Sequence, residues 1–203
     1  MDKTQKSYNQ FAAKYNDKFS IYEPYQKQMN KYVSCFKEKS KILDVGCGSG
    51  LNSKIISEAG HKIIGFDFSE SMIEIAKKNC PRGVFYVSTT ENFNSSEMFD
   101  GICLSFIIVH LSDQDAYKLI DKVSRLLNPG GYLYISFMTG KQPGYETTSF
   151  SDSEIFFNYY KTEDIIEKFT RNGFSVESRE IEPYTEKDGS TTEDVFLIFK
   201  RNL

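Results

Sequence analysis

The sequence predicts a doubly wound α/β protein with a mostly parallel sheet of seven strands, the last of them antiparallel, and helices on both faces. Short apolar runs alternate with segments whose apolar residues recur at helical spacing. The runs are almost continuously apolar, as strands buried on both faces are. The first run ends in a cluster of glycines, "GCGSG", at positions 46–50.

The first half of the chain shows this alternation clearly. "KILDVG" is a predicted strand, and the apolar residues of 51–59 predict a helix that ends at Gly60. "KIIGFD" is the second strand. Ser69 is then the predicted N-cap of a helix over "ESMIEIAKKN".

The second half continues the pattern. "GVFYVS" and "FDGICLSF" are predicted strands, and Ser112 opens a helix that ends before "NPGG". "YLYISF" is the fifth strand, and residues 138–160 have no clean period. After a helix over 162–173, two strands flank a turn signal at Asp188-Gly189 and are expected to pair antiparallel.

Composition narrows the function. A net charge of −3 favours neither nucleic acid nor an anionic membrane as a partner. The longest near-apolar run, "ICLSFIIVHL", is about half a membrane span. The 4 cysteines form no C-x-x-C pair and there are only 2 histidines, so we expect no metal site and a reducing, cytoplasmic compartment.

The glycine loop differs from phosphate-binding loops. A dinucleotide fingerprint needs a third glycine where this chain has Leu51, and no Gly-Lys-Ser/Thr ending is present. Asp67 ends the second predicted strand, where a carboxylate can accept hydrogen bonds from the two hydroxyls of a ribose. The pattern indicates a nucleoside-containing ligand without a phosphate.

At this point the sequence resembles the class I S-adenosylmethionine-dependent methyltransferases, with their Rossmann-like fold. "ILDVGCGSG", "IIGFDFSESMIEIAKK", "MFDGICLSFIIVHL" and "LLNPGGYLYIS" resemble four motifs in the family's order, and "YNQFAAKYN" resembles a segment preceding the domain in many small-molecule members. The resemblance implies methyl transfer from S-adenosyl-L-methionine, with S-adenosyl-L-homocysteine as product, to a small-molecule acceptor.

The resemblance also implies that residues 1–203 form one domain. Its parts are an N-terminal helical lid (1–38), a cofactor-binding core (39–137), an acceptor-side lid (138–160) and a C-terminal helix and strand pair (161–203).

The resemblance assigns cofactor contacts to residues at the carboxyl ends of the strands and in the lid. Asp67 would hold the ribose, Asp44 the ammonium group, and Phe68 and Met72 the adenine. The full set is Tyr8, Tyr15, Asp44, Gly46, Cys47, Gly48, Gly50, Asp67, Phe68, Met72, Thr89, Thr90, Glu91, Ser105 and Phe106.

Two segments depart from the family pattern. Relatives often have Asp where this chain has Thr89, and their Tyr-Asp steps are Tyr8-Asn9 and Tyr15-Asn16 here. The tyrosines stay candidate lid residues, whereas the acids are absent.

Residues after the fourth and fifth strands are candidates for the chemistry. His110 is a candidate general base, and an alternative is that it belongs to the shell around the cofactor. Tyr145, Phe150, Tyr159 and Tyr160 are candidate acceptor-binding residues. With Glu146, Asp152 and Glu154 nearby, these rings suit an amine or a planar organic molecule, although ordinary lid packing explains them equally well.

Three other functions stay open. A methyltransferase acting on tRNA or another macromolecule would be expected to have a basic patch, which this sequence lacks. An NAD-dependent oxidoreductase is disfavoured by Leu51. A module that binds the cofactor without catalysis fits the same motifs.

Overall fold

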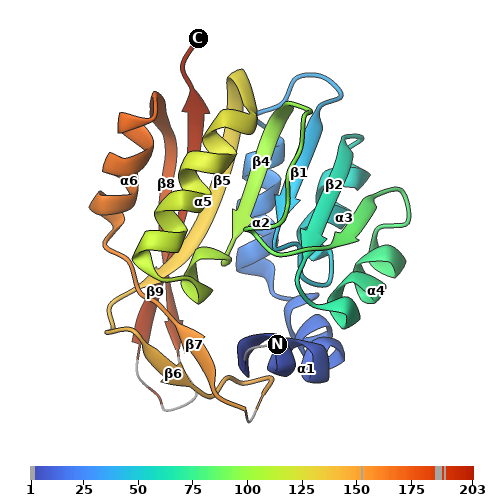
Figure 1. Cartoon of the computed structure of the whole chain (residues 1–203), viewed down its shortest axis with the longest axis vertical. Coiled ribbons are helices and arrows are strands. Elements are labelled where there is room, and N and C mark those ends of the chain that lie inside the picture. The colour runs from blue at the N-terminus through green and yellow to red at the C-terminus, as the bar shows by residue number, and fades with distance from the viewer. Residues whose placement is uncertain (1–2, 152, 186–188, 190) are drawn as a thin grey trace. The chain divides into compact units, whose positions relative to one another are not determined.

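The computed structural model describes residues 3–151, 153–185, 189 and 191–203 (Figure 1). The chain divides into two compact units. Unit 1 comprises residues 1–94 and 147–155, and unit 2 comprises residues 95–146 and 156–203. The prediction of one domain with four parts stays a prediction.

Unit 1 contains three parallel strands, β1 (Lys41–Val45), β2 (Lys62–Asp67) and β3 (Val84–Val87). Two helices connect them, α3 (Leu51–Glu58) and α4 (Glu70–Asn79). β1 is buried from Ile42 to Val45, as its apolar run predicts. Ser69 caps α4 as expected, because its hydroxyl accepts a hydrogen bond from the Met72 amide at 3.2 Å.

Two helices precede these strands, α1 (Lys3–Phe19) and α2 (Glu23–Val33). α1 packs on α4 and α2 packs on α3. Met29 and Tyr32 of α2 are fully buried. α2 starts with a proline in its first turn, where the missing amide hydrogen costs no helical hydrogen bond.

Unit 2 contains β4 (Phe99–Ser105), the short 3₁₀ helix η1 (Ile108–His110), α5 (Asp113–Leu126) and β5 (Leu127–Thr139). They are followed by β6 (Gly144–Glu146), β7 (Ile155–Phe157), α6 (Thr162–Arg171), β8 (Phe174–Thr185) and β9 (Thr191–Arg201). β4 and β5 are parallel, whereas β9 runs antiparallel to both β5 and β8.

The predicted fold class is confirmed. The strand order is β3-β2-β1-β4-β5-β9-β8, a seven-stranded mixed sheet in which the last strand is antiparallel. β6 and β7 pair in a separate two-stranded sheet. None of the helices in the described part of the chain is long and apolar enough to cross a membrane.

Details of three segments differ from the prediction or extend it. The fifth strand begins at Leu127 and not after "NPGG", because the β4–β5 register shifts between Phe99 and Gly101 and the bulge absorbs these residues. Residues 138–160, which lack a sequence period, contain the strands β6 and β7. Asp188 of the predicted hairpin turn, like Asp152, lies outside the described residues.

Candidate active site

The glycine loop between β1 and α3 has two kinds of glycine. Gly46, Gly48 and Gly50 all have positive φ, at 65°, 52° and 76°. A Cβ on Gly50 would lie 2.9 Å from the backbone Cα of Ala76 in α4, so Gly50 is needed for close packing of α3 and α4. A Cβ on Gly48 would meet only the ring of Tyr15, at 3.9 Å. Gly48 therefore leaves room between the loop and α1.

Asp67, at the end of β2, fixes this loop. One of its oxygens accepts a hydrogen bond from the Gly48 amide at 3.0 Å, and the other accepts one from the Ser69 amide at 2.8 Å. Its side chain is buried, and burial raises the pKa of the carboxyl to about 6 against the lowering effect of the backbone hydrogen bonds. Each carboxylate oxygen has two lone pairs, so both can accept a further hydrogen bond.

Asp44 supplies a second buried carboxylate on the neighbouring strand β1. It is 1% exposed, and one of its oxygens accepts a hydrogen bond from the Ser53 hydroxyl at 2.6 Å. Two buried acids on adjacent strands give unit 1 a site for cations and for hydrogen-bond donors.

Tyr8 and Tyr15 of α1 face these acids. Burial raises the pKa of both hydroxyls, and the charge of Asp67 raises each of them further. Asp44 adds to the effect on Tyr15. Both phenols are therefore neutral at physiological pH and can act as hydrogen-bond donors.

Two asparagines hold α1 in place, a role that the sequence analysis missed. Asn9 Oδ1 accepts hydrogen bonds from the Ser69 hydroxyl (2.7 Å) and the Ser71 amide (3.3 Å) at the start of α4. Asn16 accepts a hydrogen bond from Asn79, whose amide group also donates to the Ser49 carbonyl of the glycine loop, each at 2.8 Å. The asparagines that replace the family's acids thus act as neutral acceptors.

Aromatic rings pack around the two tyrosines of α1. Phe150 lies 5.7 Å from the Tyr8 ring and 5.2 Å from the Tyr15 ring, and Tyr8 lies 6.1 Å from Phe68. The segment containing Phe150 is also tied to α1 by a 2.7 Å hydrogen bond between Ser7 and Ser151. Phe150, a predicted acceptor residue, is therefore buried against predicted cofactor residues.

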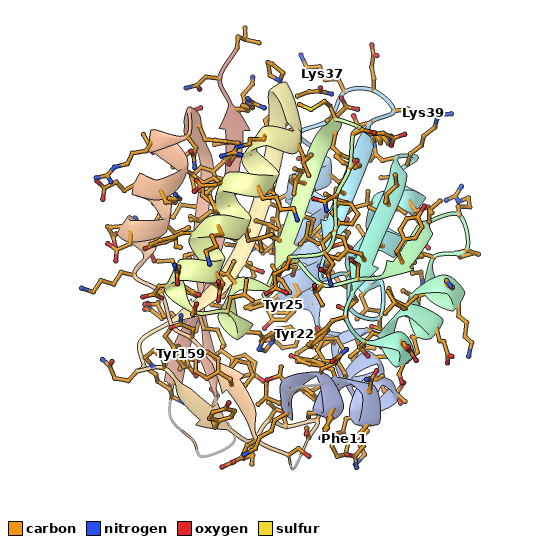
Figure 2. All side chains as sticks on the ribbon, in the orientation of Figure 1. Phe11, Tyr22, Tyr25, Lys37, Lys39 and Tyr159 are labelled. Carbon is orange, nitrogen blue, oxygen red and sulfur yellow. The ribbon has the colours of Figure 1, made fainter. Side chains whose placement is uncertain are left out.

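This aromatic cluster extends to the start of α2. Tyr15 and Phe19 are 4.7 Å apart, and Phe19 stacks on Tyr25 at 5.8 Å. Tyr22 and Tyr25, labelled in Figure 2, meet edge to face at 4.6 Å. These ring contacts thus join the end of α1 to the turn before α2 and to its first residues.

The other predicted cofactor residues of unit 1 have diverse surroundings. Met72 and Cys47 are buried, Phe68 and Thr90 are half-buried, and Glu91 is exposed. The Thr89 hydroxyl accepts from the Asn92 amide at 3.2 Å and lies 3.2 Å from a carboxylate oxygen of Glu91. Thr89 therefore stabilises its own turn in this structure.

In unit 2, Ser105 and Phe106 follow β4. The Ser105 and Ser136 hydroxyls are 3.3 Å apart, and the Phe106 amide donates to both the carbonyl and the hydroxyl of Ser136 at 3.1 Å. Within the described residues, Phe106 is the single non-glycine residue with positive φ, at 51°. The turn after β4 is thus held in an unusual conformation by β5.

His110, in η1, is oriented by the backbone of β7. Its Nδ1 lies 2.9 Å from the Phe156 carbonyl oxygen. A carbonyl can only accept, so Nδ1 carries the proton and the lone pair of the neutral ring is on Nε2. The ring also packs on Phe157 at 5.1 Å.

The three remaining predicted acceptor residues lie in unit 2, whereas Phe150 belongs to unit 1. Tyr160 donates to the Ile108 and Leu111 carbonyls, each at 2.9 Å. Tyr159 donates to Glu146 at 2.8 Å. Tyr145 is 56% exposed, and its ring lies 5.6 Å from the Phe156 ring. Across the part of the chain that the structure describes, three or more His, Cys, Asp or Glu side chains nowhere gather as metal ligands would.

Comparison with known proteins identifies the domain. Residues 42–131 match the family model of a methyltransferase domain. The ubiquinone biosynthesis O-methyltransferase of Mesorhizobium japonicum is 33% identical over 104 residues, which cover 49% of this chain and 41% of that protein. The chain thus spans about two fifths of the length of the curated relatives it matches.

Solved structures share the fold over nearly the whole chain. The DhpI–SAH complex has a TM-score of 0.77 at 14% identity and covers 98% of this chain and 96% of that one. Magnesium protoporphyrin IX methyltransferase from Synechocystis PCC 6803, with bound SAM, has a TM-score of 0.74 at 17% identity and covers 100% and 98%. The resemblance to class I S-adenosylmethionine-dependent methyltransferases is confirmed for the matched domain and the fold.

Proposed function

We propose that this chain transfers a methyl group from S-adenosylmethionine to a small-molecule acceptor by in-line displacement. The observation that carries the proposal is the pair of buried carboxylates, Asp44 and Asp67, at the carboxyl ends of β1 and β2 around the glycine loop. Ligands of such sheets bind at this edge. The domain match and the fold support the same reaction.

The residues in unit 1 fit this cofactor better than a dinucleotide. The loop "GCGSG" has no lysine or arginine for a phosphate, whereas the two acids suit an ammonium group, a sulfonium ion and ribose hydroxyls. The Ser49 hydroxyl in the loop is buried and has no hydrogen-bond partner among the described residues. A polar ligand at the loop would relieve the cost of that unmet hydrogen bond.

Each residue would have a separate task. Asp67 would accept from the ribose and Asp44 would balance the positive charge, while Tyr8 and Tyr15 would cover the ligand and exclude water. Bound S-adenosylmethionine supplies an activated methyl group, so the chain mainly provides proximity and orientation.

His110 is the proposed general base. The hydrogen bond from Nδ1 to Phe156 fixes the tautomer in which Nε2 can take a proton from an acceptor. Such a base is needed when the acceptor loses a proton on methylation. The alternative is that His110 belongs to the shell around the cofactor, and the variants described below distinguish the two roles.

The test of the function has two stages. S-adenosylmethionine and S-adenosylhomocysteine should each raise the melting temperature, and NAD should not. Incubation with isotopically labelled S-adenosylmethionine and a metabolite extract should then add one labelled methyl group to a small molecule. Stabilisation without any transfer would indicate a binding module, and stabilisation by NAD alone would contradict the proposal.

Matched variants test His110 once an acceptor is known. His110→Asn retains a donor near the position of Nδ1, whereas His110→Gln retains a polar group near Nε2. If His110 is the base, both should lower kcat by about 10²–10⁴-fold at saturating cofactor, with cofactor affinity unchanged. A loss of cofactor affinity with kcat preserved would assign His110 to the cofactor shell.

The acceptor is proposed to be a small molecule and the location cytoplasmic. The relative from Mesorhizobium japonicum is named as an O-methyltransferase of ubiquinone biosynthesis, but it matches this chain over only part of its length. Cys35, Cys47, Cys80 and Cys103 form no disulfide with one another among the described residues, which supports a reducing compartment.

A further inference from the structure

Unit 2 contains a cavity of about 540 Å³ at the carboxyl end of β5. This volume is within the usual range for small-molecule sites. Its walls come from the first turns of α5 and α6, from the residues after β5 and from the segment before α6. The lining residues are Asp113, Tyr117, Thr139, Gly140, Lys141, Gln142, Pro143, Asn158, Tyr159, Tyr160, Lys161 and Asp164.

One wall of the cavity is rigid. Asn158 is 4% exposed, and its amide group donates to the Leu111 carbonyl at 3.0 Å and to Asp113 at 2.9 Å. The Tyr160 hydroxyl donates to the Ile108 and Leu111 carbonyls. With its hydroxyl occupied by backbone carbonyls, Tyr160 contributes mainly ring surface to the cavity.

The charges of the lining favour a cation. Lys141 is paired with Glu146 at 3.3 Å, and Glu146 also accepts from Tyr159. Asp113 accepts from the neutral amide of Asn158, so its negative charge is not balanced by that contact. Asp164 has no cationic partner within the described residues. These two acids outnumber Lys161, the one lining cation without an ion pair in the described part of the chain.

Tyr117 marks the position of the negative charge. Burial raises the pKa of its hydroxyl, and the charges of Asp164 and Asp113 raise it further. The ring already accepts a cation on its face, because Lys168 Nζ lies 5.5 Å from the ring centroid. Aromatic faces beside uncompensated carboxylates are the usual surroundings of a bound ammonium group.

We propose that this cavity binds a small organic amine in its ammonium form. The ammonium group would donate hydrogen bonds to Asp113 and Asp164, and the carbon skeleton would pack on Tyr117, Tyr159 and Tyr160. The site belongs to unit 2, and its binding does not depend on the proposed methyl transfer. The two proposals can therefore fail separately.

The experiment compares three probes of similar size on the full chain. 2-Phenylethylamine is the cation, 2-phenylethanol the neutral analogue and 3-phenylpropionate the anion. Calorimetric titration should show binding of the amine in preference to the other two, and the affinity should fall as salt is added. Preferential binding of 3-phenylpropionate, or binding of none of the three, would overturn the proposal.

Variants locate the binding. Asp164 is exposed, so Asp164→Asn should fold normally and weaken amine binding by about five- to tenfold. Glu163→Gln is the matched control, because Glu163 is the adjacent acid, pairs with Arg179 at 3.1 Å and does not line the cavity. Tyr117→Phe should retain amine binding, whereas Tyr117→Leu should weaken it. Equal effects of Asp164→Asn and Glu163→Gln would contradict the assignment, as would a loss of amine binding in Lys161→Gln with Asp164→Asn unaffected.

Discussion

The two units hold their functional side chains in opposite ways. In unit 1, two buried carboxylates are acceptors: Asp44 and Asp67 take hydrogen bonds from hydroxyl and amide groups. In unit 2, the oriented side chains are donors: His110 and Tyr160 give hydrogen bonds to backbone carbonyls.

This difference indicates a division of tasks. Burying an acid costs folding free energy unless its charge is paired or hydrogen-bonded. The two buried acids of unit 1 are therefore suited to a ligand that brings cations and hydroxyl groups. Donors that are bonded to carbonyls are already satisfied, so unit 2 gains a rigid frame. Unit 1 is therefore expected to respond to its ligand and to pH, whereas removal of the Tyr160 donor in unit 2 is expected to act on stability first.

The largest expected effect is a difference in stability between variants at two glycines of the same loop in unit 1. Gly50→Ala should destabilise the protein by about 3 kcal/mol, because a Cβ would overlap Ala76 and the residue has a left-handed φ. Gly48→Ala has the strained φ but no clash, so its cost should be about 1 kcal/mol. Urea unfolding of both variants measures this; equal costs would contradict the packing role of Gly50.

The next effect concerns the acceptors of unit 1. Asp67→Ala should weaken binding of S-adenosylhomocysteine by about 1–3 kcal/mol, because the ribose would lose a charge-assisted acceptor. The control is Asp115→Ala, which removes a partly exposed acid in the first turn of α5 and should leave the affinity unchanged. Calorimetric titration with unaltered affinity in Asp67→Ala would remove this carboxylate from the site.

As the pH rises, the folding stability of unit 1 should fall while its affinity for the cofactor should rise. The pKa of Asp67 is about 6 in the folded chain, above its ordinary value of 3.8. Its contribution to folding stability is therefore full below about pH 4 and is lost as the pH rises through about 6. Cofactor binding uses the ionised carboxylate. The affinity at pH 5 should therefore be about tenfold below the constant value that it reaches at high pH.

Asp67→Asn provides the control for these slopes, because an amide does not titrate. Unfolding and cofactor titration at pH 5 and pH 7.5 should show both slopes in the natural chain and neither in the variant. A natural chain whose cofactor affinity is equal at the two pH values would show that the ionised carboxylate is not required.

The smallest effect belongs to unit 2. Tyr160→Phe should lower the free energy of unfolding by about 1 kcal/mol, because the Ile108 and Leu111 carbonyls lose their shared donor. Its affinity for S-adenosylhomocysteine should stay the same. Chemical denaturation and titration of this variant measure both quantities, and weakened cofactor binding without destabilisation would contradict a structural role.

Local patterns in the sequence were sufficient for much of the fold. Ser69 and Ser112 cap their helices as predicted, since a cap depends on residues three positions apart. The sequence patterns identified the seven strands of the main sheet, and in β1 and β4 burial on both faces leaves a continuously apolar signal. Glycine at the three loop positions permits the positive φ found there, although residue type alone does not require it.

Contacts between distant residues had to come from the tertiary structure. In the sequence, Asn9 and Asn16 only mark the absence of the family's acids. Their hydrogen-bond partners at the start and end of α4 lie 60 to 63 residues away. Which ring nitrogen of His110 carries the proton depends on the carbonyl of a residue 46 positions later. Residue type and spacing fix which groups are present, whereas partners and protonation depend on packing between segments that no local pattern relates.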